Sequence, residues 1–214
     1  MFTESNAIVH IVDDDAGMRN SLGMLVQSVS LPSRSYASAE EFLSEADLTQ
    51  AGCVLLDLRM PGMGGIELLQ RLRAASVGIP VILISGHADV PTTVRGMKLG
   101  AVDLLQKPIE PSVLIDAVRR NLDVSRAMNQ QRNGSQSIRD RFAALTRRET
   151  ELLKLIVNGH SNKQIATGIG ISIKTVANHR ASLMAKTGAV NAADLVRLFT
   201  IADPSASRQT EQSS

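Results

Sequence analysis

The sequence has few aromatic residues and a single cysteine. Four Phe, one Tyr and no Trp occur among 214 residues, so hydrophobic cores must consist mainly of aliphatic side chains. The single cysteine, Cys53, excludes an internal disulfide and any metal site built from several cysteines. It lies in the apolar segment 52–56, where a small buried side chain is a better interpretation than a reactive thiol.

Long hydrophobic runs are missing as well. No apolar run approaches the roughly 20 residues that a membrane-spanning helix needs. Residues 1–5 lack the basic stretch and the apolar stretch that together mark a signal peptide. We therefore expect a cytoplasmic protein with no membrane partner.

Charge is unevenly distributed along the chain, whose formal net charge is only +2. Residues 1–123 contain 10 Lys/Arg and 15 Asp/Glu, a net charge of −5. Residues 124–214 contain 13 Lys/Arg and 6 Asp/Glu, a net charge of +7. This difference favours an acidic module joined to one that contacts a polyanion, although small domains also differ in charge by chance.

The first 123 residues alternate short apolar runs with amphipathic stretches. Strands are predicted at 7–12, 33–37, 53–56, 80–84 and 102–105. Helices are predicted at 15–30, after Ser38, at 66–75, at 90–99 and from Pro111 onward. Asp15 is typical of a helix N-cap, and Ser38 with Glu41 has the spacing of a capping box. The alternation predicts an α/β domain, a (βα)5 doubly wound parallel sheet with helices on both faces.

The remainder of the chain has a different character. Residues 124–141 are polar and lose the apolar periodicity, which predicts a linker, either a flexible tether or an extension of the preceding helix. Residues 142–203 read as an all-α domain with four helices, three of which begin after Thr146, Ser161 and Ser172. The polar tail 204–214 is expected to be disordered.

Polar side chains follow four of the predicted strands. Asp13 and Asp14 come after the first strand, Asp57 after the third, Ser85 after the fourth and Lys107 after the fifth. Ligands collect at the carboxyl ends of parallel strands, so these side chains are expected to share one crevice. Clustered carboxylates need a cation, and oxygen ligands suit Mg²⁺. A carboxylate beside Mg²⁺ can attack a phosphoryl group, whose oxygens Ser85 and Lys107 would hold.

At this point the chain resembles the receiver domains of two-component response regulators. The similar segments are 12–15, 56–63, 84–90 and 106–108. The resemblance implies that Asp57 is the phosphoacceptor. It also implies that Asp13 and Asp14 organise Mg²⁺, with the backbone carbonyl of Arg59 as a further ligand. The glycines at 62, 64 and 65 fit a tight loop after the phosphorylated residue.

The same resemblance assigns roles near the last two strands. Ser85 would be the switch hydroxyl and Lys107 would contact the phosphoryl group, with a cis bond between Lys107 and Pro108. Many receivers have an aromatic residue three positions before the lysine, where this chain has Leu104, which puts the usual aromatic switch in doubt. His87 is more readily interpreted as an exposed loop residue than as a functional one.

Residues 162–186 have the pattern of two short helices joined by a glycine-containing turn at 168–171. This pattern is typical of a helix-turn-helix, whose second helix enters the major groove of DNA. The predicted buried stripe of that helix consists of Ile173, Val176, Leu183 and Met184. The predicted outward face, basic and free of acids, consists of Lys174, Thr175, Asn178, His179 and Ser182. An ordinary solvated face in a four-helix bundle fits the same pattern.

Segments 145–149, 161–166 and 171–180 resemble the LuxR-type helix-turn-helix, so nearly the whole chain is similar to the FixJ/NarL class of response regulators. The implied phosphate contacts are Lys163, Lys174, Thr175, His179 and Arg180. Asn178 is the implied base reader, because Asn can pair with adenine through two hydrogen bonds. Many relatives carry a longer basic residue at the position of Ala177, so their site preference does not carry over.

These features together predict a phosphorylation-dependent transcriptional regulator. A sensor histidine kinase would phosphorylate Asp57, and the face formed by the fourth helix and fifth strand would repack. That face would then form a homodimer that reads paired DNA half-sites, or it would release the DNA-binding domain.

Two other classes of protein were weighed. An adaptor that docks proteins without binding DNA is disfavoured by the basic helix, and an enzyme with external substrates is disfavoured because the helical half contains no second acid–base cluster. The expected chemistry is limited to Mg²⁺-dependent self-phosphorylation and self-dephosphorylation at Asp57.

Overall fold

The structure is a computed structural model that describes residues 7–86 and 90–205. The chain folds into two compact units, Met1–Gln130 and Gln131–Ser214. The predictions for His87 and for the tail beyond residue 205 lie outside the described ranges. Within those ranges, no helix combines the length and the apolarity that crossing a membrane requires.

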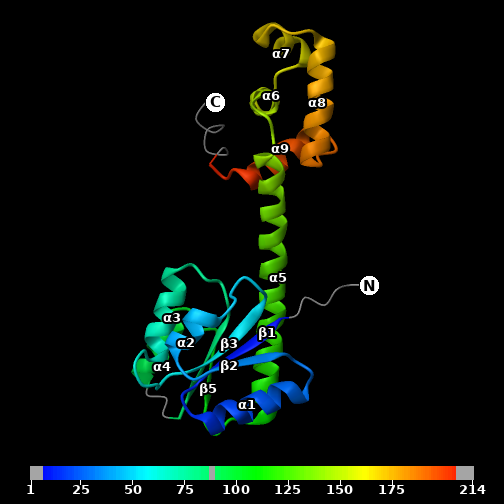
Figure 1. Cartoon of the computed structure of the whole chain (residues 1–214). Coiled ribbons are helices and arrows are strands. Elements are labelled where there is room, and N and C mark those ends of the chain that lie inside the picture. The colour runs from blue at the N-terminus through cyan, green and yellow to red at the C-terminus, as the bar shows by residue number, and fades with distance from the viewer. Residues whose placement is uncertain (1–6, 87–89, 206–214) are drawn as a thin grey trace. The chain divides into compact units, whose positions relative to one another are not determined.

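The first unit contains a parallel sheet of five strands in the order β2-β1-β3-β4-β5 (Figure 1). The strands are β1 (Ile8–Val12), β2 (Ser33–Tyr36), β3 (Gly52–Asp57), β4 (Val81–Ser85) and β5 (Asp103–Gln106). The helices that alternate with them are α1 (Ala16–Ser28), α2 (Ala39–Glu45), α3 (Gly65–Ala74), α4 (Val90–Lys98) and α5 (Pro111–Ala143). The predicted (βα)5 sheet is therefore confirmed.

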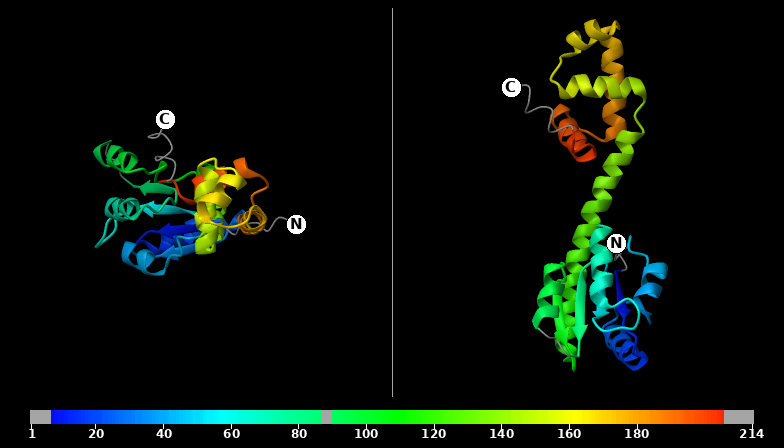
Figure 2. Two further views of the ribbon diagram at one scale, coloured as in Figure 1. Left: turned by 90° about the horizontal axis from the view of Figure 1, so that it is seen from above. Right: turned by 90° about the vertical axis from the view of Figure 1, so that its left-hand side faces the viewer.

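Helices cover both faces of this sheet because successive strand residues point to opposite sides. On β3, Cys53 and Leu55 belong to the core shared with α1 and α5, whereas Val54 and Leu56 belong to the core shared with α2 and α3 (Figure 2). Both faces of the central strands are apolar, as a doubly covered parallel sheet requires. Burial raises the pKa of the Cys53 thiol to about 12, which confirms its interpretation as an inert core residue.

The predicted helix starts in this unit are largely correct. Asp15 caps α1 by accepting a hydrogen bond from the Met18 amide at 2.9 Å. Ser38 caps α2 by accepting from the Glu41 amide at 3.1 Å. The carboxylate of Glu41 accepts from the amide of Ala37, one residue before the cap, so the reciprocal half of the predicted capping box is shifted by one residue.

The segment 124–141 lies within α5, which continues without interruption to Ala143. Of the two forms that the sequence left open, the structure has the helical one. Ser125 holds this helix against the sheet, because its hydroxyl accepts a hydrogen bond from the Gly52 amide at 2.9 Å. Further along, Gly134 lies in the helix interior, and no atom approaches within 4 Å of the position that a Cβ would take.

As far as residue 205, the second unit is helical and contains the end of α5 followed by four helices. These are α6 (Arg147–Val157), α7 (Asn162–Ile169), α8 (Ile173–Thr187) and α9 (Ala192–Ala202). Complete capping boxes begin α6 at Thr146 and α7 at Ser161. The turn predicted at 168–171 is shorter, because α7 continues to Ile169 and ends at Gly170, whose φ of 70° suits glycine.

Candidate acidic site and nucleic-acid interface

The sheet order brings four predicted site residues to neighbouring strand ends. Asp13 follows β1, Asp57 ends β3, Ser85 ends β4 and Lys107 follows β5, and these four strands are adjacent in that order. The strands are parallel, so their carboxyl ends meet at one edge of the sheet. The strand ends that carry these residues therefore meet at one edge of the sheet, as the sequence predicted.

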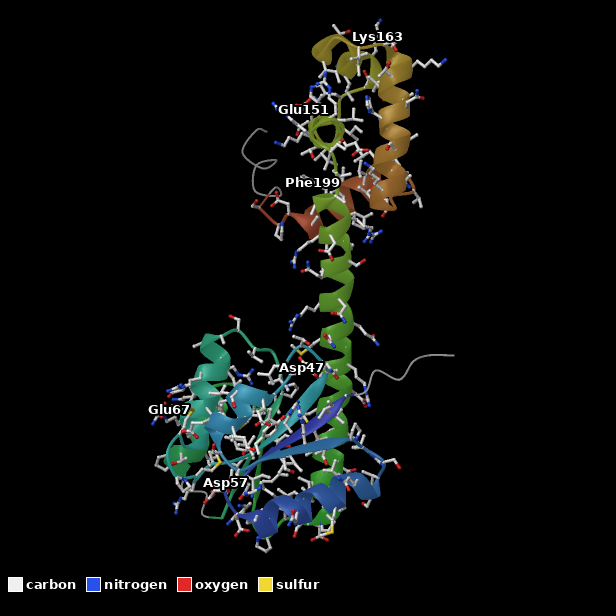
Figure 3. The ribbon with its side chains drawn as sticks, in the orientation of Figure 1. Asp47, Asp57, Glu67, Glu151, Lys163 and Phe199 are labelled. Atoms are coloured by element: carbon white, nitrogen blue, oxygen red, sulfur yellow. The ribbon has the colours of Figure 1, made fainter. Side chains whose placement is uncertain are left out.

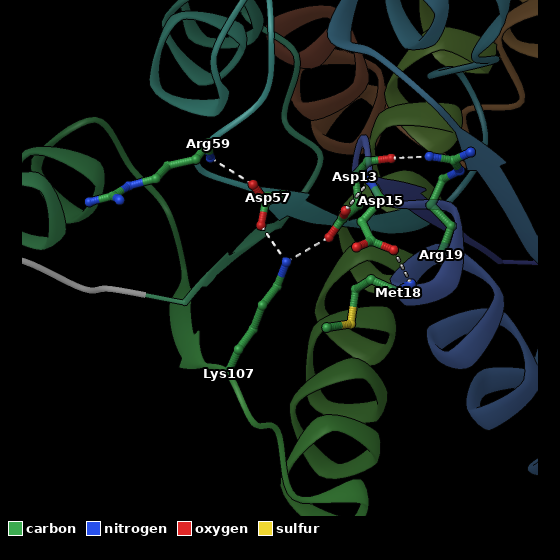
Figure 4. Close-up of polar contacts among 7 residues, drawn as sticks. All are labelled: Asp13, Asp15, Met18, Arg19, Asp57, Arg59 and Lys107. Carbon is green, nitrogen blue, oxygen red and sulfur yellow. Dashed lines mark hydrogen bonds and ion pairs between the residues drawn. The ribbon is translucent and has the colours of Figure 1, made fainter.

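Lys107 joins the two buried carboxylates at this edge of the sheet. Its Nζ atom lies 2.8 Å from Asp13 Oδ2 and 2.6 Å from Asp57 Oδ1 (Figure 4). Burial alone lowers the pKa of Lys107, but the hydrogen bonds to Asp13 and Asp57 outweigh it, so the pKa is raised and the ammonium is charged. The bond between Lys107 and Pro108 is cis, as predicted.

The second carboxylate oxygen of Asp57 also has a hydrogen-bond partner. Oδ2 accepts a hydrogen bond from the Arg59 amide at 2.7 Å, which places the main chain of Arg59 beside the carboxylate. Burial raises the pKa of Asp57, whereas the bonds from Lys107 and Arg59 act to lower it. Gly65 lets α3 start close to this residue, since a Cβ there would lie 2.3 Å from the Asp57 carbonyl oxygen.

Asp13 and Asp14 differ in their environments although both were predicted to organise a metal. Asp13 is buried, and its Oδ1 accepts from the Asp15 amide at 2.8 Å. Its carbonyl oxygen accepts from Arg19 Nη1 at 2.6 Å. Asp14 is exposed. Arg19 was not singled out in the sequence, because nothing in a helical arginine indicates that it reaches back to a strand end.

The carboxylates of this site fit a hard cation. Asp13 Oδ2 and Asp57 Oδ1 already converge on one positive group, the ammonium of Lys107. In the described ranges, no three His, Cys, Asp or Glu side chains gather as a metal-binding group. Two carboxylates completed by main-chain and water oxygens are a common ligand set for Mg²⁺, which keeps several of its waters in proteins. The residues present therefore fit Mg²⁺.

Ser85 contributes a hydroxyl that is not yet used. The residue is 2% exposed, and its Oγ has no hydrogen-bond partner among the residues that the structure describes. A buried hydroxyl without a partner costs free energy, which favours a role that a ligand completes. Leu104, at the position where many receivers have an aromatic residue, is half-buried. It packs against the core on the α2 and α3 side of the sheet, so its side chain does not point freely into solvent.

The helix-turn-helix predicted in the second unit is formed by α7 and α8, with Lys163 on α7 (Figure 3). Lys163, Lys174 and Asn178 are exposed, whereas Thr175 and His179 are half-buried. Val176 and Leu183 are fully buried, as predicted.

One residue of the predicted stripe was wrong. Ile173, the first residue of α8, is 53% exposed. Periodicity assigns a residue to a helix face but does not show whether that face is covered at the helix end. The face available to a ligand therefore includes one large apolar side chain.

Two of the predicted phosphate contacts have partners inside the unit. The Thr175 hydroxyl lies 2.8 Å from Ser172 Oγ at the start of α8. Arg180 donates to the side chain of Asn162 at 3.0 Å, which links α8 to the first residue of α7. Arg180 thus links the two helices through one N–H donor, and its guanidinium carries further donors for a DNA phosphate.

Glu149, in the first turn of α6, fixes α8 against α6. Besides closing the capping box with Thr146, it accepts hydrogen bonds from Ser182 at 2.9 Å and Lys186 at 2.8 Å. The bond from Lys186, followed by those from Thr146, lowers its pKa to about 2, so the carboxylate is ionised.

Comparison with known proteins identifies the family. A family described as "Response regulator receiver domain" matches residues 9–119, and a second described as "Bacterial regulatory proteins, luxR family" matches residues 143–199. The chain therefore belongs to the response regulators that combine a receiver with a LuxR-type DNA-binding domain.

Several relatives match over nearly their whole length. The chain is 41% identical to the transcriptional regulatory protein FixJ of Azorhizobium caulinodans, over 91% of this chain and 92% of that protein. It is 40% identical to the C4-dicarboxylate transport transcriptional regulatory protein DctR of Rhodobacter capsulatus, over 89% of this chain and 98% of that protein.

Solved structures agree with the fold. The response regulator StyR is similar with a TM-score of 0.82 and 40% identity, over 91% of this chain and 98% of that chain. Full-length FixJ from B. japonicum is similar with a TM-score of 0.54 and 36% identity, over 92% of this chain and 98% of that chain. The chain is a phosphorylation-dependent transcriptional regulator rather than a metabolic enzyme, and its domains imply a histidine kinase and DNA as partners.

Proposed function

We propose that Asp57 accepts the phosphoryl group in a receiver domain at residues 1–123, which a linker at 124–141 joins to a DNA-binding domain at 142–203. The observation that carries this proposal is the arrangement around Asp57. A buried carboxylate is paired with the ammonium of Lys107, and the neighbouring strand ends at Ser85, a buried hydroxyl without a partner among the described residues.

The protein groups that the phosphoryl transfer would use all lie at this edge of the sheet. A carboxylate oxygen of Asp57 attacks phosphorus, an acyl phosphate bond forms, and the bond to the phosphohistidine nitrogen of the kinase breaks. Lys107 then exchanges its bond to Asp57 Oδ1 for one to a phosphoryl oxygen, and Ser85 donates its hydroxyl hydrogen to another. Hydrolysis by water returns Asp57 to its carboxylate.

The metal would be held by Asp13, Asp57 and the main-chain carbonyl of Arg59, with Asp14 close by in the sequence. When bound, Mg²⁺ offsets the negative charge on the transferring oxygens. The role of this chain is to aim the Asp57 oxygens and to keep Lys107 ready as a counter-charge.

The switch would act through β4 and β5, whose carboxyl ends carry Ser85 and Lys107. On the elements joined to these strands, α4 and the residue before β5, the structure exposes apolar side chains, with exposed fractions of 44% for Val94, 44% for Met97 and 43% for Val102. We assign this face to the homodimer that phosphorylation favours, because exposed apolar side chains on elements joined to the switch strands become useful when a partner covers them.

In the dimer, each α8 would enter one half-site of the DNA. Lys163, Lys174 and His179 would contact phosphates. Thr175 and Arg180, which are now bonded to Ser172 and Asn162, would also contact phosphates. Asn178 would read a base. A regulator that acts on a bacterial chromosome works in the cytoplasm, which is the location we propose.

A mass measurement tests the phosphorylation site. The full-length protein is incubated with Mg²⁺ and acetyl phosphate, and its intact mass is recorded. Wild type and Asp47→Ala, a control at an exposed aspartate, should each gain one phosphoryl group, and Asp57→Ala should gain none. Equal labelling of Asp57→Ala would assign the phosphoryl group to another residue and overturn the proposal.

A further inference from the structure

Glu40 lies outside the residues assigned to the phosphorylation site, yet it contacts the loop that carries one of them. It is in the first turn of α2, and its Oε1 accepts a hydrogen bond from the Met63 amide at 3.0 Å. Met63 belongs to the loop between β3 and α3, which begins directly after Asp57. The bond therefore joins a helix on one face of the sheet to the loop of the reactive strand.

The near end of this loop is tied to Asp57 itself. The Arg59 amide donates to Asp57 Oδ2 at 2.7 Å, and the Leu58 carbonyl accepts from the Gly65 amide at 3.2 Å. Met60 is buried, whereas Pro61 and Gly62 at the loop tip are exposed. Between the tip and α3, the Glu40 carboxylate provides the hydrogen bond that secures the loop to another element.

The backbone at the tip is shaped for this contact. Gly62 has a φ of 73°, a conformation that residues with a side chain rarely adopt. A Cβ at this position would lie 3.1 Å from Glu40 Oε1. The carboxylate thus lies directly against the peptide between Gly62 and Met63, and glycine leaves room for it.

We propose that Glu40 is a positioning residue of the phosphorylation site, because it fixes the β3–α3 loop so that the main chain of Arg59 stays beside Asp57. Glu40 does not touch the reacting atoms; it acts through Met63. Its hydrogen bonds from main-chain amides, its own first and then that of Met63, lower the pKa of the carboxyl, so the acceptor is an anion near neutral pH. The inference rests on the proposed role of Asp57 and of the Arg59 carbonyl in holding Mg²⁺.

The same helix turn offers a matched control. Glu41 also accepts a main-chain hydrogen bond with its carboxylate, from the Ala37 amide, but this bond stays within the β2–α2 connection and does not reach the loop. The variants Glu40→Ala and Glu41→Ala each remove one carboxylate together with the bond that it accepts from the main chain of another residue. Glu40→Gln keeps an oxygen that can accept from Met63, so it should retain the loop.

The experiment measures Mg²⁺ binding to the full-length protein by calorimetry, the amide NMR signals of Arg59 and Met63, and the thermal unfolding midpoint. In Glu40→Ala we expect about tenfold weaker Mg²⁺ binding, the loss that is common when a group supporting a metal ligand is removed. Both amide signals should shift, and the unfolding midpoint should change no more than in Glu41→Ala. Glu40→Gln should recover most of the Mg²⁺ affinity.

Two results would overturn the inference. One is wild-type Mg²⁺ affinity in Glu40→Ala with an unmoved Arg59 signal, in a protein whose wild type binds Mg²⁺ and is phosphorylated on Asp57. The other is equally weakened binding in Glu41→Ala, which would make the effect a general consequence of damaging α2. If instead wild type itself neither binds Mg²⁺ nor accepts a phosphoryl group, the proposed function has failed, and the inference that rests on it falls too.

Discussion

A single ammonium group is paired with both buried carboxylates at the reactive edge of the sheet. Lys107 is bonded to both Asp13 and Asp57, so neither acid is left as an unpaired buried charge. A phosphoryl group on Asp57 would carry more negative charge than the present carboxylate. The ammonium of Lys107 would therefore move towards the phosphoryl oxygens. Ser85, which has no competing bond among the described residues, is free to do the same.

Replacement of Ser85 by alanine should separate stability from signalling. Because the hydroxyl is buried and makes no hydrogen bond among the described residues, Ser85→Ala should leave the free energy of unfolding unchanged or raise it by up to about 1–3 kcal/mol. The phosphorylated variant should nevertheless bind DNA more weakly than phosphorylated wild type. Urea unfolding measures the stability and a DNA shift assay measures the binding, and a clear loss of stability would mean that the hydroxyl already has a partner.

His10 should make the first unit sensitive to acid. It is buried beside Tyr36 and Phe42, with its Nδ1 3.1 Å from the Tyr36 hydroxyl. Burial, and then the nearby charge of Arg34, lowers its pKa from 6.5 to about 4. The folded state therefore favours the neutral ring, and the stability this contributes is complete above pH 6.5 and is lost as the pH falls towards 4.

The variant His10→Gln, which can still bond to Tyr36, should remove this dependence. Between pH 6.5 and 4, wild type should lose on the order of 2–3 kcal/mol more unfolding free energy than the variant. Urea unfolding across this range gives both curves, and parallel curves would show that His10 is not the group responsible.

At the scale of elements, glycine determines how closely α4 approaches the sheet. A Cβ on Gly96 would lie 2.4 Å from the Cδ1 atom of Leu83, a fully buried residue of β4. Gly96→Ala should therefore push α4 away from the strand that ends at Ser85 and destabilise the first unit by about 1–3 kcal/mol. Thermal unfolding measures the loss, and unchanged stability would mean that α4 moves away without cost.

Gly134 in α5 provides the opposite case. It lies inside a helix with nothing near the position of a Cβ, so Gly134→Ala removes backbone freedom without a clash. This variant should stabilise the helix by about 0.5–1 kcal/mol and raise the helical circular dichroism signal. A lower signal would indicate that residue 134 is not helical in solution.

Local signals made most of these elements predictable from the sequence. Caps such as Asp15, Thr146 and Ser161 depend on residues within one helical turn, and the buried strands are recognised from short apolar runs. Contacts between distant segments were not predictable: the exposure of Ile173 depends on how other segments pack around it, and the bond from Met63 to Glu40 joins residues with no common pattern. In the site, the positions of the polar residues after the strands predicted which residues meet, but not that Lys107 spans two carboxylates.

At the scale of the whole molecule, the two halves of the chain carry opposite net charges, −5 for residues 1–123 and +7 for residues 124–214. DNA affinity should therefore fall steeply with salt, because bound lysines release counterions from the phosphates. Lys174→Ala should reduce the slope of this dependence by about one, whereas Lys154→Ala, an exposed lysine on α6, should leave it unchanged. Equal slopes for both variants and wild type would move the DNA contact away from α8.

DNA selection from fragmented genomic DNA tests the central claim most directly. Full-length wild type and Asp57→Ala are compared with Mg²⁺, each with and without acetyl phosphate. The account predicts that phosphorylated wild type enriches paired half-sites and that Asp57→Ala does not. Equal enrichment by both proteins would contradict control by Asp57, and no enrichment by protein shown to be phosphorylated would contradict DNA binding itself.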